Sequence, residues 1–248
     1  MTRLSVNVNK IALLRNSRGG NRPSVVEAAE IAIAAGCHGI TIHPRIDSRH
    51  ATLADIAALM DLEPIRSGRI ELNVEGDLRD DLLRAAKQAG AHQFTVVPVA
   101  AGEITSNRGW NRNDDCDGLR RAIAFLGPRI RVSLFVNATA AQVEMAAELG
   151  VQAVEFYTAD YAHAHGTGDA RAELRQLADC AALARKLRLR VHIGHDLDTA
   201  NLPDIIAALA PDEASIGHGL ISDAVLLGLP RTVSSYLQAM RKNKRSAA

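Results

Sequence analysis

Eight short runs of apolar and β-branched residues recur along this chain of 248 residues, and they constrain its fold more than any other feature. Segments rich in alanine and leucine lie between the runs and have the spacing of helices. A strand followed by a helix, repeated eight times over about 250 residues, has the length and period of a (β/α)8 or TIM barrel. We therefore predict an α/β protein with this fold, in one domain over residues 1–248. The predicted strands are residues 4–8, 39–43, 70–74, 94–98, 130–136, 152–157, 189–193 and 213–217.

Local signals support the helices between these strands. Ser24-Val-Val-Glu27 and Thr139-Ala-Ala-Gln142 have the pattern of capping boxes, in which side chains bond the free N–H groups of a first helical turn. Gly36, Gly90 and Gly150 stand where helices should end, because a left-handed residue is favoured there.

A weak internal repeat and one missing motif bear on the alternative fold, an open doubly wound sheet. Residues 35–44 echo residues 89–98, and residues 149–157 repeat the same step from helix through glycine to strand. Doubly wound sheets usually have fewer units and an early glycine-rich phosphate loop. The sequence has no GxGxxG motif and no P-loop, and no linker divides it. The barrel is therefore the favoured prediction.

Composition and charge argue against several classes of partner. Apolar residues make up 47% of the chain, and 29 basic residues nearly balance 28 acidic ones. A dedicated nucleic-acid binder would carry a clustered basic surface, so we expect no nucleic-acid partner. The basic run at residues 241–245 is interpreted as a solvated tail.

Cysteine usage and hydropathy indicate the compartment. Cys37, Cys116 and Cys180 are odd in number and have neither metal nor disulfide spacing, which indicates a reducing environment. The sequence shows no signal peptide and no apolar run long enough to span a membrane. We therefore predict a soluble cytoplasmic protein without a membrane partner.

The segment Gly39–His50 contains the densest cluster of side chains that carry chemistry. A buried parallel strand needs apolar residues alone, yet this one ends in His43, and two arginines, an aspartate and a second histidine follow within seven residues. The cluster indicates a site for an anionic substrate. Asp47 and Arg49 are interpreted as residues that order the loop.

Other predicted strands end in polar side chains as well. TIM barrels carry their chemistry at the carboxyl ends of their strands, so these side chains are expected to meet at one mouth. They are Asn7, Asn9, Lys10, Asn73, Glu75, Glu155, Tyr157, His192, His195 and His218.

Several candidate residues have a second, structural interpretation. Glu75 and Glu155 are either solvated rim charges or enclosed acids with a raised pKa that transfer protons. Residues 215–223 resemble the loop and helix start with which barrels hold phosphate, although a simple turn fits as well. Arg18 is either an anion clamp or part of a polar loop.

The remaining histidines are assigned structural roles. His38 and His92 stand at strand beginnings, where we expect capping or surface positions. His163 and His165 form a His-x-His pair, but a mobile loop is favoured over a metal site. No other pattern supports a metal site, so a metal-free acid–base mechanism is predicted.

Ordered motifs along nearly the whole chain point to one family. They are Val6–Gly19, Gly39–His50, Asn73–Glu75, Glu103–Ser106, Val132–Phe135, Gly194–Leu197 and Ser215–His218. With these motifs the chain resembles the pyridoxine 5′-phosphate synthase family, which closes the pyridine ring in the deoxyxylulose-dependent route to vitamin B6. The resemblance implies a barrel with extra helices, assembled as a homo-octamer from dimers.

The resemblance also implies a reaction and its residues. It implies condensation of 3-amino-1-phosphoacetone (3-amino-2-oxopropyl phosphate) with 1-deoxy-D-xylulose 5-phosphate to pyridoxine 5′-phosphate, phosphate and water, without metal or cofactor. His43 and Glu75 would be general bases, His195 a general acid, and Glu155 a stabiliser of transition-state charge. The amino-ketone phosphate would be held by Asn7, Arg18, Asp196, Gly217 and His218, and the sugar phosphate by Asn9, Lys10, Arg45, His50 and Thr105.

The sequence departs from the pattern of the family at three places. Asn9-Lys10 replaces Asp-His, a difference between subtypes, and Val99 stands where an acidic residue is common. His192-Ile193 replaces Asn-Ala, which is expected to place a titratable ring beside His195 and to alter its surroundings. Two alternatives therefore stay open: a related barrel enzyme acting on a different phosphorylated keto-sugar, and a non-catalytic sensor of sugar phosphates.

Overall fold

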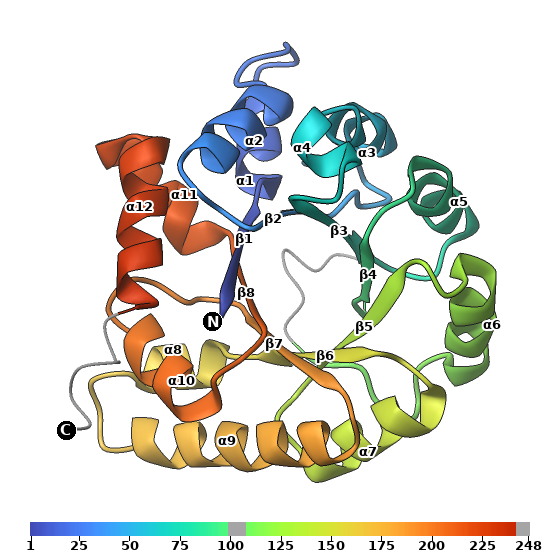
Figure 1. Ribbon diagram of the computed structural model, residues 1–248, viewed down its shortest axis with the longest axis vertical. Coiled ribbons are helices and arrows are strands. Elements are labelled where there is room, and N and C mark those ends of the chain that lie inside the picture. Colours follow the sequence, from blue (N-terminus) through green and yellow to red (C-terminus); the bar gives the residue numbers. More distant parts are fainter. Residues whose placement is uncertain (99–107, 242–248) are drawn as a thin grey trace.

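The computed structural model describes residues 1–98 and 108–241, in which eight parallel strands close into a barrel in chain order (Figure 1). The fold predicted from the sequence is confirmed. Each strand lies within two residues of its predicted bounds. The strands are β1 (Arg3–Asn7), β2 (Gly39–Ile42), β3 (Glu71–Gly76), β4 (Gln93–Val96), β5 (Arg131–Val136), β6 (Ala153–Tyr157), β7 (Arg190–Gly194) and β8 (Glu213–Ile216).

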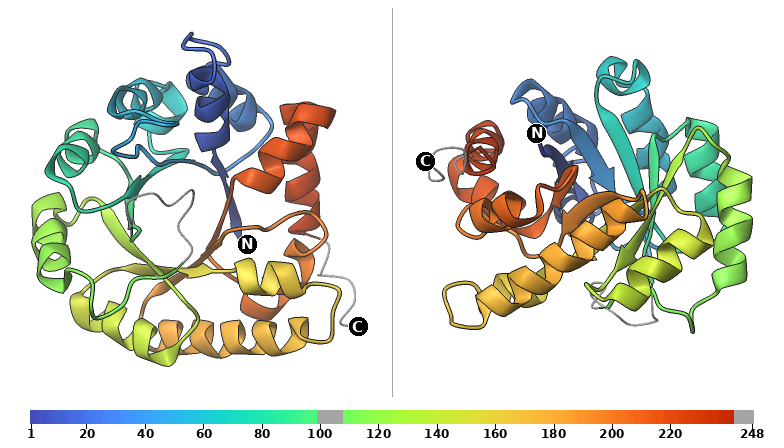
Figure 2. Two further views of the ribbon diagram at one scale, coloured as in Figure 1. Left: turned by 180° about the vertical axis from the view of Figure 1, so that it is seen from behind. Right: turned by 60° about the horizontal axis from the view of Figure 1, so that its bottom comes forward.

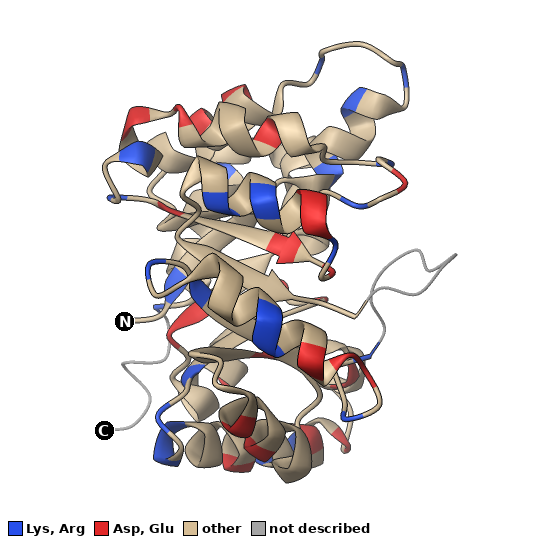
Figure 3. Ribbon diagram, turned by 90° about the vertical axis from the view of Figure 1, so that its right-hand side faces the viewer, with Lys and Arg blue, Asp and Glu red and all other residues tan. Residues whose placement is uncertain are grey.

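Helices surround the barrel (Figure 2). Within the described residues they are α1 (Asn9–Asn16), α2 (Val25–Ala34), α3 (Leu53–Met60), α4 (Glu63–Arg66), α5 (Asp80–Ala89), α6 (Cys116–Leu126), α7 (Ala140–Leu149), α8 (Ala159–Ala164), α9 (Ala170–Lys186), α10 (Leu202–Leu209), α11 (His218–Leu227) and α12 (Leu229–Ala239). Several strands are followed by two helices, so the barrel has extra helices. Basic and acidic residues are interspersed over the outer helices (Figure 3). In the described part of the chain, no helix is both long and apolar enough to cross a membrane.

The strands have an apolar outer face and a polar inner face. Leu4 and Val6 of β1 are fully buried in the hydrophobic core, and Ser5 lies between them. The hydroxyls of Thr41 on β2 and Ser215 on β8 lie 3.3 Å apart although β1 separates their strands, which is possible only across the lumen. The Ser5 and Thr41 hydroxyls are 2.7 Å apart. TIM barrels usually fill this space with branched aliphatic residues, so the hydrogen-bonded lumen is a particular feature of this chain.

Charged residues close the amino-terminal end of the lumen. Glu71 forms ion pairs with Arg3 at 2.8 Å and Arg131 at 3.1 Å. His192 lines a cavity of about 500 Å³ at this end. The expectation that this ring lies beside His195 is wrong, because the side chain of His192 points into the amino-terminal end of the lumen.

One side-chain hydrogen bond recurs at the amino ends of four strand pairs. In each pair, the side chain of the residue just before the second strand accepts a hydrogen bond from a backbone N–H of the first strand. The backbone N–H of that accepting residue in turn donates to the carbonyl of the first-strand residue that bonds its side chain. The bond confirms the capping interpretation of the two strand-start histidines, and three of the acceptors stand at the same place in the weak sequence repeat. The acceptors His38, His92, Gln152 and Asp212 bond Leu4, Leu72, Val132 and Val191 at 3.1, 3.0, 2.8 and 2.9 Å.

The helix ends follow the sequence signals. Ser24 and Thr139 each accept a hydrogen bond from the N–H three residues further along. In the second predicted box, Gln142 Oε1 accepts a hydrogen bond from the N–H of Asn137, two residues before the Thr139 cap, and not from the N–H of the cap itself. Gly36, Gly90 and Gly150 have φ values of 99°, 75° and 84°, so all three helix ends use left-handed glycine.

The recurring bond predicts the effect of replacing His92. His92→Ala leaves the partly buried Leu72 N–H without its side-chain acceptor, and we expect the free energy of unfolding to fall by about 1–2 kcal/mol. His92→Gln should lose less, because Gln152 accepts the corresponding bond elsewhere in the barrel. Urea denaturation of both variants measures the difference. Equal losses would contradict a role for the acceptor atom.

Candidate active site

A cavity of about 460 Å³ opens at the carboxyl ends of the strands. Twelve of the fourteen predicted site residues line it: Asn7, Asn9, Lys10, His43, Arg45, His50, Glu75, Glu155, His195, Asp196, Gly217 and His218.

The other two predicted residues lie elsewhere. Arg18 is exposed in the turn after α1 and is not among the residues that line the cavity. Thr105 falls outside the described residues. The cavity also includes side chains that sequence reasoning missed, among them Arg49 and Phe135. For Phe135 the inward alternation of β5 was a usable signal, whereas the position of Arg49 depends on the conformation of its loop.

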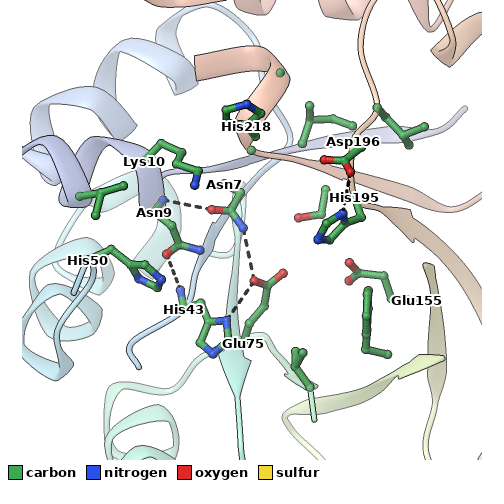
Figure 4. A pocket seen from close by; sticks show the side chains of 18 of the residues that line it. Asn7, Asn9, Lys10, His43, His50, Glu75, Glu155, His195, Asp196 and His218 are labelled. Atoms are coloured by element: carbon green, nitrogen blue, oxygen red, sulfur yellow. Dashed lines mark hydrogen bonds and ion pairs between the residues drawn. The ribbon is translucent and has the colours of Figure 1, made fainter. Parts of the chain in front are cut away.

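A hydrogen-bonded network joins the ends of β1, β2 and β3 (Figure 4). The Asn9 Oδ1 atom accepts a bond from the backbone N–H of His43 at 2.8 Å, and Asn7 Oδ1 accepts one from the Asn9 N–H at 3.0 Å. Asn7 Nδ2 donates to Glu75 Oε2 at 3.3 Å, and His43 Nδ1 lies 3.9 Å from the same oxygen. The two asparagines therefore fix the imidazole and the carboxyl next to each other.

His43 is held in its neutral form. Burial lowers its pKa to about 3, and the nearby His50, Arg45 and Arg79 act in the same direction. Burial and Arg45 also lower the pKa of His50, to about 4. A neutral imidazole has one unprotonated nitrogen, which is the atom that a general base uses to accept a proton.

The acids of the cavity are shifted in the opposite direction. Burial raises the pKa of Glu75 to about 7, and Glu213 below it adds to the rise. Burial, Glu75 and Glu213 raise the pKa of Glu155 well above its ordinary value. Glu75 is thus poised to exchange a proton near pH 7, while the raised pKa of Glu155 favours its protonated form, which can donate a hydrogen bond.

Positive charge gathers on the β2 side of the cavity. Arg45 is buried, with Nε 3.6 Å from Asp47 Oδ2, and Arg49 lies 2.7 Å from the same carboxylate. Asp47 therefore orders the loop, as predicted. Lys10 and His50 line the same wall, and together these groups suit a phosphate ester.

The β7 side carries His195 and Asp196. His195 Nδ1 lies 3.2 Å from Asp196 Oδ2, and the imidazole meets the ring of Tyr157 edge-on with centroids 4.9 Å apart. Gly194 packs against Glu155, since a Cβ at Gly194 would lie 2.4 Å from Glu155 Oε1. The imidazole and the neutral acid are thus brought to one wall of the cavity.

The β8 side presents the start of α11. Gly217 precedes the helix, which has no side-chain cap, and His218 begins it. The free N–H groups of a first helical turn form an anion site. Residues 215–219 all line the cavity, so the phosphate interpretation of this segment suits its position.

The His-x-His pair lies at the edge of the site. His163 is exposed, with Nε2 3.5 Å from Asp196 Oδ2, and His165 lies 3.6 Å from Asp204. Across residues 1–98 and 108–241, no group of three or more His, Cys, Asp or Glu side chains is placed to hold a metal ion.

The family model and the curated relatives agree on one family. The model of the family described as pyridoxal phosphate biosynthesis protein PdxJ matches residues 4–242. A pyridoxine 5′-phosphate synthase from Xanthomonas axonopodis pv. citri (strain 306) is 45% identical over 99% of each chain. One from Bacteroides fragilis (strain YCH46) is 42% identical over 97% of this chain and 100% of its own.

Solved structures with a similar fold share little sequence identity with this chain. Phosphoribosyl anthranilate isomerase from Thermotoga maritima has a TM-score of 0.60 at 11% identity and covers 97% of this chain and 99% of its own. TrpF from Jonesia denitrificans has a TM-score of 0.58 at 17% identity and covers 97% of each chain. At these identities the likeness shows the barrel fold alone.

The raised pKa of Glu75 predicts a pH-dependent stability. The pKa of Glu75 in the folded protein, about 7, exceeds its ordinary value of 4.5. The stabilisation that Glu75 adds to the free energy of unfolding is therefore fully present below pH 4.5 and is lost as the pH rises through about 7. Between about pH 5 and about pH 8, the free energy of unfolding should fall by roughly 2–3 kcal/mol more in the wild-type protein than in Glu75→Gln.

Urea denaturation at the two pH values checks this difference. Glu144→Gln, on the exposed side of α7, is the matched control and should show the wild-type pH dependence. The same pH dependence in Glu75→Gln and the wild-type protein would contradict an enclosed, proton-holding Glu75.

Proposed function

Because this chain belongs to the pyridoxal phosphate biosynthesis protein PdxJ family, we propose that it condenses 3-amino-2-oxopropyl phosphate with 1-deoxy-D-xylulose 5-phosphate to pyridoxine 5′-phosphate. One observation carries the proposal for the site: a neutral histidine, an acid titrating near pH 7 and a protonated acid share a cavity with anion-binding groups. Imine formation, loss of phosphate and ring closure all require protons to move on and off carbon and oxygen.

The proton-transfer roles follow from the charge states. His43 and Glu75 act as bases, since the first is neutral and the second titrates near pH 7. His195, on the opposite wall, supplies a proton to the leaving oxygen as the general acid (Figure 4). Glu155, as a protonated acid, donates a hydrogen bond to oxygen that gains negative charge in the transition state.

Two anion-binding walls suit two phosphorylated substrates. On the β2 side, Asn9, Lys10, Arg45 and His50 bind the sugar phosphate, and the family pattern adds Thr105. On the β8 side, the start of α11 binds the amino-ketone phosphate. The residues of this second set are Asn7, Asp196, Gly217 and His218, to which the family pattern adds Arg18.

Neither alternative function is favoured by an observation. A different keto-sugar substrate was suggested by Val99, which falls outside the described residues, and by His192, which lies at the opposite end of the barrel. A sensor of sugar phosphates would need the anion-binding walls but no shifted acid beside a neutral histidine.

Assembly and compartment are further parts of the proposal. Family membership favours a homo-octamer built from dimers, and exposed apolar residues on the neighbouring helices α1 and α11 offer surfaces for it: Leu13, Leu14, Val225, Leu226 and Leu227. The three cysteines are unpaired, which suits the reducing cytoplasm.

The central test is the condensation itself. The purified protein with both substrates should release phosphate and form pyridoxine 5′-phosphate, and absence of product where a known synthase is active would reject the proposal. His43→Ala, Glu75→Gln and His195→Ala should each lower kcat by about 100-fold or more, because each removes a proton-transfer group. Glu144→Gln is the control and should keep wild-type kcat, and circular dichroism verifies the fold.

The packing of Gly194 predicts a separate loss of activity. In Gly194→Ala the new Cβ would lie 2.4 Å from Glu155 Oε1, so the Glu155 carboxyl must move. We expect kcat to fall by about 10- to 100-fold, as displaced catalytic groups usually cause. Gly168→Ala, where no atom lies within 4 Å of the new Cβ, is the matched control and should keep its activity. Full activity of Gly194→Ala would show that the Glu155 position is not critical.

A further inference from the structure

The turn that carries His195 has a conformation that its own residues disfavour. The inward positions of β7 are His192 and Gly194, so an extended strand would point residue 195 outward, away from the cavity. Instead, φ is 90° at His195 and 56° at Asp196. Residues other than glycine rarely have such angles, and they persist only where the surrounding structure holds them.

Thr158, directly after β6, is fully buried against this turn. Its backbone N–H donates to the Gly194 carbonyl at 3.1 Å. Its hydroxyl oxygen lies 2.7 Å from that carbonyl oxygen and 2.6 Å from the carbonyl oxygen of His195. Because the backbone N–H already serves Gly194, the single hydroxyl proton is available to the His195 carbonyl.

The geometry of this contact depends on the rotation of His195. Successive carbonyls of an extended strand point in opposite directions. One hydroxyl therefore reaches the carbonyls of Gly194 and His195 together only when His195 leaves the extended conformation. The hydrogen bond and the positive φ select the same backbone, and that backbone turns the imidazole toward the cavity.

The second half of the turn, at Asp196 and Asp198, is also held by side-chain hydrogen bonds. Asn201 Nδ2 donates to the Asp196 carbonyl at 3.2 Å, and Asn201 Oδ1 accepts from the Asp198 N–H at 2.9 Å. The hydroxyl of the buried Tyr161, in the helix that begins after Thr158, donates to the Asn201 carbonyl at 2.8 Å. The end of β6 and α8 thus support the whole turn.

We propose that Thr158 is a positioning residue for the reaction: its hydroxyl fixes the backbone of His195 and so aims the imidazole at the bound substrates. β6 therefore supplies Glu155 to the cavity and also sets the direction of the imidazole on β7. The inference rests on the proposed function, in which His195 is the general acid.

Paired substitutions test the proposal. Thr158→Val keeps the shape of the side chain and removes the donor, so kcat should fall by about 10- to 100-fold while KM for both substrates stays within about threefold. Thr158→Ser keeps the hydroxyl and should retain kcat within about threefold of wild type. Wild-type kcat in Thr158→Val would overturn the proposal. Thr158→Ala replaces the valine variant if the latter does not fold.

A double-mutant cycle separates positioning from a merely structural role. In the His195→Ala background, Thr158→Val should cause no further loss of the residual rate, because it acts through a group that is already gone. An equal fractional loss in both backgrounds would overturn the proposal.

Crystal structures of the variants give a readout that needs no activity. His195 should lose its positive φ and move its ring in Thr158→Val, and should keep both in Thr158→Ser. An unmoved His195 in Thr158→Val would overturn the inference. A wild-type protein that forms no product would instead refute the proposed function and leave the placement of His195 to be judged from these structures.

Discussion

The alternation of side chains along eight closed parallel strands is the constraint on which the rest of the structure depends. Every second side chain points outward to the helices, as Leu4 and Val6 do, and there the apolar core forms. The other side chains cannot reach a helix and must find partners within the lumen. The hydroxyls of Ser5, Thr41 and Ser215 meet this requirement by bonding one another. Because the lumen is polar, the inward-pointing positions at the carboxyl ends of the strands can be acids and histidines.

The buried acids in these rows influence each other's protonation. Glu75 on β3, Glu155 on β6 and Glu213 on β8 are all desolvated, and each of the first two has its pKa raised further by its neighbours. A few ångströms away, burial and nearby cations keep His43 neutral. The same enclosure therefore stabilises a protonated acid and an unprotonated base at one pH. An exposed glutamate with an ordinary pKa would be ionised near neutrality, and an exposed histidine would be partly protonated there.

The sequence predicted those parts of the fold and site that depend on local pattern. Strand bounds follow from apolar runs, and site residues such as His43 and Glu75 follow from their places at strand ends. The depth of an inward side chain in the lumen is not encoded by local pattern, so His192, expected beside His195, lies at the opposite end of the barrel. The contact of Thr158 with the carbonyl of His195 joins residues 37 positions apart, and no local pattern encodes it.

The strained turn at His195 follows from the same alternation. Position 194 points inward but is already occupied, because the Glu155 carboxyl fills the space that any side chain there would need. The imidazole must therefore come from position 195, which an extended strand would direct outward. Two positive φ values, at His195 and Asp196, change that direction, at an energetic cost of about 1–3 kcal/mol each. Glycine at 194, strain at 195 and a buried hydroxyl at 158 are thus three consequences of placing an acid and an imidazole on neighbouring strands of a closed barrel.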